Sequence, residues 1–420
     1  MSARRLGLGS GTALVVAAMI GTGVFTTSGF LLESLHSPWA VLAVWAVGGL
    51  VATLGAVSYG ALARRIPESG GEYVFLSRTI HPAAGYLAGW VTLLFGLASP
   101  AAAAALGFAH YVAPWLPEFL SPPMVATVVL VVAALPHAGG MERAALVQRL
   151  AVAVEVVLIV AFLIGGAGHL HLPAAGPAPA AGALATSLIF VSYAYSGWNT
   201  VVYVGGEVAD PTRNLPRAML IGALGVTALY LALNAIFLFT VPVSQLAGRM
   251  EVGRIAAQAI GGRVLAEAVS GLIAFVLATF VSSMMMAGPH VTARMAADGY
   301  LPALLRAAPG RPPRAALWLQ LLLSVALVWF QKPDAILQYV GFTLGLSTAV
   351  TVIGLILLRR REGAAAVPVW GWPWVPALFL VFVIGSTGFA MAQRPLVSLA
   401  AAAALGLGLL GFRWSRKKSP

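Results

Sequence analysis

Long apolar stretches recur along the whole chain, and short polar segments separate them. A membrane-spanning helix needs about 20 mainly apolar residues, and the chain offers about 12 stretches close to this length. Because these stretches are continuous and do not alternate between apolar and polar positions, helices are favoured over a β-barrel. The pattern therefore predicts an all-α polytopic membrane protein. The expected helices cover residues 10–34, 38–63, 83–113, 122–137, 144–167, 181–205, 217–241, 264–293, 315–331, 334–358, 367–391 and 395–413.

Three of the intervening segments have patterns of their own. Residues 66–80 begin with Pro and Gly and continue as one or two amphipathic turns, whereas residues 244–263 are polar and periodic, which predicts a short surface helix. Residues 170–182 are rich in Pro, Gly and Ala and are expected to form a loop. None of the three suggests a soluble domain, so residues 1–420 are expected to form a single membrane domain.

The composition narrows the class of protein further. Hydrophobic residues make up 60% of the chain and charged residues only 9%, whereas a soluble domain carries about 25% charged residues. This excludes a cytosolic enzyme, a nucleic-acid binder and a disordered chain. The absence of cysteine excludes a disulfide framework, a thiolate metal site and a Cys nucleophile. His169 and His171 have no further ligand cluster around them, so neither a metal site nor a cofactor is predicted.

The basic residues indicate an orientation in the membrane. If the N-terminus lies in the cytoplasm, 20 of the 25 Lys and Arg residues fall on the cytoplasmic side of the expected helices. Cytoplasmic loops are enriched in Lys and Arg, so the asymmetry supports the helix count and predicts that both termini lie on the cytoplasmic side of an inner (plasma) membrane. The first apolar run is longer than a signal-peptide core, which predicts a retained helix. The net charge of +12 is therefore an orientation signal and does not indicate nucleic acid.

Two of the expected helices contain sequences that interrupt regular helical bonding. The first contains Gly21-Thr22-Gly23, and the sixth contains Tyr195-Ser196-Gly197-Trp198-Asn199. Small residues also allow helices to pack closely, and that is the alternative interpretation of each sequence taken alone. The two positions correspond, however, if the first ten helices form two five-helix repeats, and paired interruptions of this kind indicate a transporter site. A helix N-terminus there would attract a carboxylate, and unwound carbonyls would accept bonds from an ammonium group.

At these residues the chain resembles the amino acid–polyamine–organocation superfamily, and within it the bacterial amino acid permeases. Residues 20–25 (IGTGVF) and 194–199 (AYSGWN) are similar to motifs of the family's first and sixth helices. Residues 207–218 (EVADPTRNLPRA), 67–73 (PESGGEY) and 295–302 (MAADGYLP) are similar to its loop motifs. The motifs occur in the family's order over residues 20–302, and together they are specific.

The resemblance implies a LeuT-type fold with two inverted five-helix repeats, in which helices 1 and 6 are broken. Repeat one would cover about residues 10–167, repeat two about 181–358, and two extra helices about 367–413. It implies a secondary active transporter, a symporter or an exchanger, that moves an amino acid or a related small amine by alternating access. The partners expected are the small-molecule substrate and the lipid bilayer, with no nucleic acid and no obligatory protein partner.

The resemblance also assigns roles to residues around the two breaks. Gly21 and Gly197 belong to the expected substrate-binding residues at the breaks, and Trp198 and Asn199 would lie in the pocket or just behind it. Tyr193 matches an aromatic position that covers the site from outside, although ordinary packing is the alternative for both aromatic residues. The N–H groups of Thr22, Gly23 and Val24 would bind the substrate carboxylate, and the carbonyls of Ile20, Tyr193, Ala194 and Ser196 would bind its amine.

Glu155 is the ionisable residue that lies deepest in an expected helix. It follows Arg143 by 12 residues, or about 18 Å along a helix, which places it near the middle of the bilayer. A carboxylate there must be paired, hydrated or protonated, and the partner is expected from another helix, with His290 as one candidate. Several proton-coupled relatives carry Lys at the corresponding position. We therefore expect Glu155 to titrate during transport or to help bind a cation, with a structural carboxyl satisfied by hydroxyls as the alternative.

The coupling ion is left open between protons and sodium. Ser282 and Ser283 lie in the eighth expected helix, near the region where relatives coordinate sodium with hydroxyls. Ser and Thr also satisfy helix backbones routinely, so a purely structural role is the alternative. In the loop after the sixth helix, Glu207 and Arg213 are either a gate pair or solvated charges.

Other functions are less favoured. A membrane-embedded enzyme needs a nucleophile with its base or a metal cluster, and the sequence contains neither an HExxH nor a GxSxG motif. A channel favours a charged ring or a filter repeat, and none is visible. Among transporters, an exporter or antiporter of cationic amino acids or polyamines is the main alternative, because Glu155 could bind a cationic substrate. Few charges line the expected site, which favours a neutral or small substrate.

Overall fold

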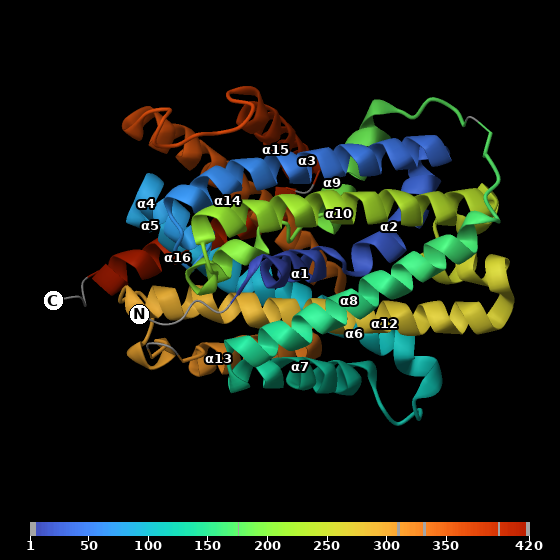
Figure 1. Cartoon of the computed structure of the whole chain (residues 1–420), viewed down its shortest axis with the longest axis horizontal. Helices are drawn as coiled ribbons and strands as arrows, with labels where there is room; N and C mark the ends of the chain where they lie inside the picture. Colours follow the sequence, from blue (N-terminus) through green and yellow to red (C-terminus); the bar gives the residue numbers. More distant parts are fainter. Residues whose placement is uncertain (1–5, 175, 309–310, 331–332, 394, 417–420) are drawn as a thin grey trace.

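The chain is all-helical in the part that the structure describes (Figure 1). The computed structural model describes residues 6–174, 176–308, 311–330, 333–393 and 395–416. Within these ranges the only β pairing is an isolated bridge between Leu6 and Val208. The all-α prediction is therefore confirmed for the described residues.

In the part of the chain that the structure describes, eight helical stretches are long and apolar enough to cross a membrane, as expected of an integral membrane protein. The first stretch consists of α1 (Leu8–Met19) and α2 (Thr22–Leu35), and the third consists of α5 (Pro82–Val91), a π-helical turn (Thr92–Leu97), α6 (Ala98–Val112) and η2 (Ala113–Trp115). The other six are single helices: α3 (Pro38–Arg65), α7 (Pro122–Gly139), α8 (Met141–Ala167), α10 (Pro211–Thr240), α12 (Val252–Ala297) and α15 (Trp374–Gln393).

The remaining elements complete the chain. Two shorter apolar helices are α9 (Ala181–Ala194) and α13 (Arg314–Phe330), and two further long helices are α14 (Pro333–Glu362) and α16 (Pro395–Arg416). The short elements are α4 (Glu72–Thr79), η3 (Thr200–Glu207), α11 (Val243–Leu246) and η4 (Ala303–Leu305).

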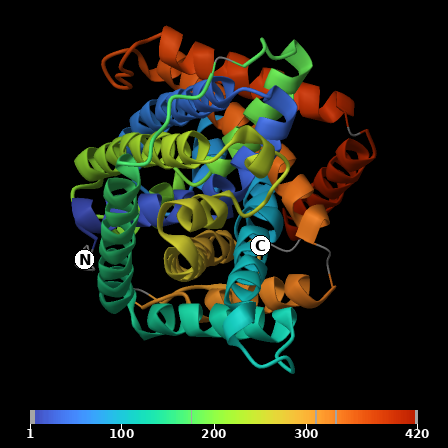
Figure 2. The same cartoon turned by 90° about the vertical axis from the view of Figure 1, so that its right-hand side faces the viewer.

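The long helices pack side by side along the long axis of the molecule (Figure 1). The helix α1 is almost completely buried and contacts α8, α10 and α12, while α3 packs along α10 and α6 packs along α12. Seen end-on, α12 lies within the bundle, with α7 at one edge, α15 at the opposite edge and α16 to the side (Figure 2). The first break, at the end of α1, therefore lies among the packed helices of the bundle.

The expected interruptions coincide with the boundaries of the observed elements. The first expected helix divides after Met19 into α1 and α2, and the sixth divides after Ala194 into α9 and η3. The amphipathic turns expected in residues 66–80 form α4, and residues 176–180 are irregular, as expected for the loop. Residues 244–263 form the end of α11 and the first part of α12, which bends at Gly261 and Gly262.

Candidate functional site

The first break exposes the N-terminal turn of α2. Ile20 and Gly21 have extended backbone conformations, so α1 ends and α2 starts afresh at Thr22. The first N–H groups of a new helix have no partner within it, and no side chain caps α2. The N–H groups of Thr22, Gly23 and Val24 are thus available to an anionic group, and the helix dipole favours negative charge there.

The second break follows α9 and is stabilised by a few local hydrogen bonds. The N–H of Ser196 donates to the carbonyl of Tyr193 (2.9 Å), and the N–H of Thr200 donates to the carbonyl of Gly197 (3.0 Å). Gly197 has a φ of +105°, a conformation that favours glycine. The chain then continues as the 3₁₀ helix η3. Regular α-helical bonding is therefore lost from the end of α9 to the end of η3.

The two breaks pack directly against each other. A Cβ atom placed on Gly23 would lie 2.6 Å from the Cβ of Ala194, and one placed on Gly197 would lie 2.2 Å from the carbonyl oxygen of Ala18. The hydroxyl of Tyr230, on α10, lies 2.6 Å from the carbonyl oxygen of Met19 and 3.2 Å from that of Ala194. Glycines at both breaks and one tyrosine hydroxyl therefore bring together the free N–H groups of α2 and the carbonyls at the end of α9.

The residues expected at this site differ in burial. Thr22, Gly23, Tyr193, Ser196 and Gly197 are half-buried, whereas Ile20, Gly21, Val24 and Ala194 are buried. Half-buried residues on two facing breaks are typical of a site that opens to a ligand path.

Trp198 and Asn199 point away from the break toward other elements. The Trp198 ring is buried against the ring of Tyr59 on α3 (4.7 Å between centroids) and that of Phe379 on α15 (6.0 Å). The side-chain amide of Asn199 donates to Glu72 Oε1 (2.5 Å). Of the two positions considered from the sequence, in the pocket or behind it, the geometry corresponds to the second.

Glu155 is fully buried between α8 and α12. Its Oε2 lies 2.7 Å from the hydroxyl oxygen of Thr279, which also lies 2.8 Å from the carbonyl oxygen of Val276. A threonine hydroxyl has one proton and can donate to only one of these two oxygens. The partner does come from another helix, but it is a hydroxyl and not His290, whose Nδ1 is bonded to the carbonyl of Met286 (3.0 Å).

The two serines of α12 face in different directions. The hydroxyl of Ser282 lies 3.0 Å from Nε2 of His137 on α7, and the hydroxyl of Ser283 donates to the carbonyl of Phe280 (2.7 Å). In this conformation each hydroxyl already has a partner within the protein. The structure does not bring the two hydroxyls together with Glu155, whose bonded neighbour is Thr279.

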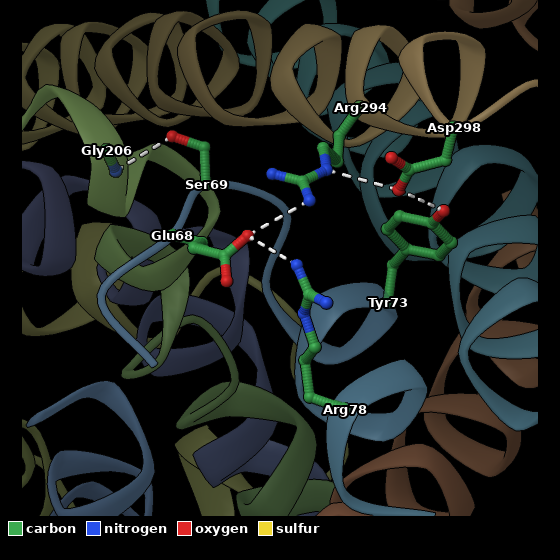
Figure 3. Close-up of polar contacts among 7 residues, drawn as sticks. All are labelled: Glu68, Ser69, Tyr73, Arg78, Gly206, Arg294 and Asp298. Atoms are coloured by element: carbon green, nitrogen blue, oxygen red, sulfur yellow. Dashed lines mark hydrogen bonds and ion pairs between the residues drawn. The ribbon is translucent and has the colours of Figure 1, made fainter. Parts of the chain in front are cut away.

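A polar network closes one end of the bundle, the end where α12 finishes (Figures 1 and 3). Oε2 of Glu68 lies 3.0 Å from Nη2 of Arg294 and 3.3 Å from Nη2 of Arg78. Nε of Arg294 also lies 3.1 Å from Oδ2 of Asp298, which accepts from the hydroxyl of Tyr73 (2.6 Å). We call Glu68, Tyr73, Arg78, Arg294 and Asp298 the polar latch.

The polar latch connects segments that are far apart in the sequence. It ties the loop before α4 to the end of α12, and the neighbouring Ser69 accepts a hydrogen bond from the N–H of Gly206 in η3 (2.9 Å; Figure 3). Among the described residues no ion pair joins Glu207 and Arg213, the pair considered as a gate from the sequence. The ion pairs at this end of the bundle include those of Glu68 and Arg294 and the separate pair of Arg65 and Glu362.

Sequence reasoning missed Tyr230 and the polar latch for a physical reason. The contacts of Tyr230 with Met19 and of Glu68 with Arg294 join residues more than 200 positions apart, and no local pattern reports such a pairing. One signal was available for Tyr230, because a tyrosine in the middle of an apolar helix needs a partner for its hydroxyl. For the latch, the PESGGEY and MAADGYLP motifs identified the segments but not the pairing.

Known proteins are similar in sequence over nearly the whole chain. A family model described as amino acid permease matches residues 6–410. The chain is 27% identical over 415 residues to the mouse Asc-type amino acid transporter 1, an alignment that covers 94% of this chain and 78% of the relative. It is 27% identical over 438 residues to the mouse large neutral amino acids transporter small subunit 2, covering 99% and 82% of the two chains.

A third relative is similar over a shorter region. The mouse b(0,+)-type amino acid transporter 1 is 31% identical over 251 residues, which cover 57% of this chain and 51% of the relative. The helical architecture and the paired breaks define a membrane transport protein. The chain belongs to the amino acid permease family, within the amino acid–polyamine–organocation superfamily, and it is a transporter and not an enzyme.

Proposed function

We propose that this protein is a secondary active transporter of neutral amino acids that works by alternating access. The observation that carries the proposal is the contact between the two helix breaks. Free N–H groups at the start of α2 face the carbonyl end of α9, and the Tyr230 hydroxyl joins the two sides. An amino acid zwitterion has the matching pair of groups, a carboxylate for the N–H groups and an ammonium for the carbonyls.

A neutral side chain fits this site better than a charged one. The residues of the two breaks carry no ionisable side chain apart from the phenols of Tyr193 and Tyr195, and a buried charge without a partner is costly. Glu155 is bonded to Thr279 and not to a residue of either break. A relative whose name describes transport of large neutral amino acids gives further support.

The proposed architecture is the LeuT-type arrangement of two inverted repeats. The divided stretches α1–α2 and α9–η3 would be the first and sixth crossings, and α16 would be the twelfth. The distribution of Lys and Arg supports cytoplasmic termini, which would put the polar latch on the cytoplasmic side. The name of one relative describes that protein as a small subunit, which implies that it has a partner subunit. For this chain we propose instead that it transports its substrate without an obligatory protein partner.

Transport of L-leucine into liposomes that contain the purified protein tests the proposed function. We expect saturable uptake and counterflow, with excess L-alanine or L-serine competing and L-arginine and putrescine not competing. Conductance without saturation would indicate a channel, and competition by arginine or putrescine alone would favour a transporter of cationic substrates.

A matched pair of variants tests the position of the site. Gly23→Ala places a methyl group against Ala194, whereas Gly9→Ala, in the first turn of α1, meets no atom within 4 Å. We expect Gly23→Ala to lower leucine uptake by at least about tenfold, since the breaks must separate, and Gly9→Ala to leave it unchanged. Equal uptake by both variants would move the site away from the breaks.

For coupling, we propose that Glu155 exchanges a proton during the transport cycle. If the hydroxyl of Thr279 donates to the carbonyl of Val276, the short contact to Glu155 requires a proton on the carboxyl. The other oxygen of Glu155 is buried without a hydrogen bond, which also favours the neutral form. Hydroxyls in this region could instead assist sodium, with Ser282 and Ser283 as candidates after rearrangement.

Glu155→Gln tests this role, with Glu267→Gln as the control. Glu267 is exposed and pairs with Arg263 on the surface, so its loss should not affect transport. We expect Glu155→Gln to retain counterflow but to lose the stimulation of uptake by an inward proton gradient. Unchanged uptake with an unchanged response to pH would rule out the coupling role, and a sodium requirement in the wild type would point to the serines.

A further inference from the structure

A buried carboxyl, that of Glu72, lies next to the second break and outside the site described above. Glu72 is the first residue of α4 and is only 2% exposed. It follows Gly70 and Gly71, whose φ values are +125° and +57°. A Cβ atom on Gly71 would lie 2.2 Å from the ring of Tyr203, so the absence of a side chain lets the loop press against η3.

The carboxyl of Glu72 joins three elements. Its Oε1 accepts from the amide of Asn199 (2.5 Å) and from the hydroxyl of Tyr59 on α3 (3.1 Å). Its Oε2 is buried and makes no hydrogen bond of ordinary geometry, although the side chain of Tyr203 faces the carboxyl. The ring of Tyr59 in turn packs on Trp198, next to Asn199. Displacement of Glu72 would therefore remove a direct contact from Asn199 and an indirect one, through Tyr59, from Trp198.

The environment of Glu72 favours its neutral form. Burial raises the pKa of its carboxyl, and the neighbouring polar side chains of Tyr203, Tyr59 and Asn199 offset this only in part. The groups that face it are these two phenols and one amide, with Thr351 and Thr92 behind the phenols. Once water reaches the carboxyl, its pKa returns toward the ordinary value for a glutamate and the proton is released.

Access of water to Glu72 depends on the polar latch. The latch residue Glu68 precedes it in the same loop, and Tyr73 follows it directly. The N–H of Gly70 donates to the carbonyl of Tyr203 (3.0 Å), so the loop and η3 are fastened to each other beside the latch. The loop carries Glu72, and η3 carries Tyr203 against it, so a movement that separates the loop from η3 would expose the carboxyl.

We propose that Glu72 is a positioning residue for transport, whose carboxyl holds Asn199 and the second break while this end is closed and exchanges its proton when the latch opens. The inference rests on the proposed function, because the break it positions is the proposed substrate site. It adds a link between the loop before α4 and that site. The ligand-binding groups remain the backbone groups of the two breaks, and Glu72 acts on them through Asn199.

The pH dependence of leucine counterflow is the first test. Glu72→Gln keeps the size of the side chain and an oxygen acceptor but does not titrate. We expect this variant to retain counterflow, while the wild-type variation between about pH 5 and about pH 8 becomes at least about threefold smaller. The control is Glu362→Gln, which removes an exposed carboxylate paired with Arg65 at the same end of the molecule and should keep the wild-type profile. A wild-type profile in Glu72→Gln would overturn the proposal.

Hydrogen–deuterium exchange of the purified protein gives a readout that does not need transport. We expect Glu72→Ala to raise exchange in residues 196–207 by at least about tenfold, because Asn199 loses its acceptor, and Glu72→Gln to raise it much less. Unchanged exchange in Glu72→Ala would overturn the proposal even if the variant transports poorly. If the wild type shows no leucine transport but the exchange result holds, the proposed function fails and the positioning of the break by Glu72 stands.

Thermal unfolding across pH provides a check on the buried carboxyl. A carboxyl whose pKa is raised by folding contributes stability below its unfolded pKa, and this contribution is lost as the pH rises through the folded pKa. The wild type should therefore lose more stability than Glu72→Gln as the pH rises from about 4 to about 8. Parallel curves for the two proteins would show that Glu72 does not carry the proton.

Discussion

At the scale of single residues, buried hydroxyls and carboxyls carry the contacts that matter most. Tyr230 connects the carbonyls of Met19 and Ala194, while Glu155 and Glu72 each join two or more helices. These groups lie in a bundle whose core is mainly apolar. A buried polar group without its partner costs about 1–3 kcal/mol, so each of these contacts has a measurable effect when removed.

The variant Tyr230→Phe tests the bridge between the two breaks. Loss of the hydroxyl leaves two buried carbonyls without their donor, so we expect a loss of about 1–3 kcal/mol in unfolding free energy and weaker leucine binding. The control is Tyr195→Phe. The ring of Tyr195 contacts that of Tyr230, and the hydroxyl of Tyr195 is buried without a hydrogen bond of ordinary geometry. Thermal unfolding in detergent should show the loss for Tyr230→Phe only; equal stability of the two variants would contradict the bridge.

At the scale of elements, the interrupted helices could be located from the sequence. Glycines separated by one residue and a Ser-Gly-Trp-Asn run indicated where regular bonding fails, and α1–α2 and α9–η3 divide there. The sequence could not show that Gly23 packs on Ala194 or that Trp198 turns toward Tyr59. Those contacts depend on how the helices pack, which amino-acid preferences along one segment do not specify.

Gly197→Ala measures how tightly the second break fits the first. The added methyl group would meet the carbonyl of Ala18, and the φ of +105° strains any L residue, so we expect a loss of at least about 2 kcal/mol. Gly182→Ala, at the start of α9, meets no atom within 4 Å and should be neutral or slightly stabilising. The measurement is the melting temperature of each variant in detergent. Equal melting temperatures for Gly197→Ala and Gly182→Ala would argue against a close fit of the two breaks.

At the scale of the whole molecule, one end of the bundle is closed by ion pairs and the centre by backbone contacts. The residues of the polar latch come from α4, from the loop before it and from the end of α12, so they close only when these segments meet (Figure 3). The side chains of Glu68 and Arg294 are 35% and 28% exposed. Each such pair contributes at most about 1 kcal/mol, which allows the latch to open readily.

Arg294→Gln should favour the open state of this end. The chain has no cysteine, so one cysteine introduced at the buried Val204 of η3 reports access by its rate of reaction with a maleimide. We expect the rate to rise about threefold to tenfold, since two partly exposed pairs are lost, and added salt to raise the wild-type rate in the same direction. Arg65→Gln, which removes the separate pair with Glu362, should leave the rate unchanged. An unchanged rate in Arg294→Gln would show that the latch does not hold this end closed.

The Tyr230 bridge has a consequence for the relative rates of exchange and net transport. One phenolic proton faces two backbone carbonyls and can donate to only one of them at a time, whereas an amino acid's ammonium group would add a second donor. Under the proposed function, an empty carrier would then change conformation with fewer donors for these two oxygens than a loaded carrier. We therefore expect bound substrate to speed the return step. We expect one-for-one exchange to run at least about tenfold faster than net flux, as counterflow and uptake into empty vesicles would show.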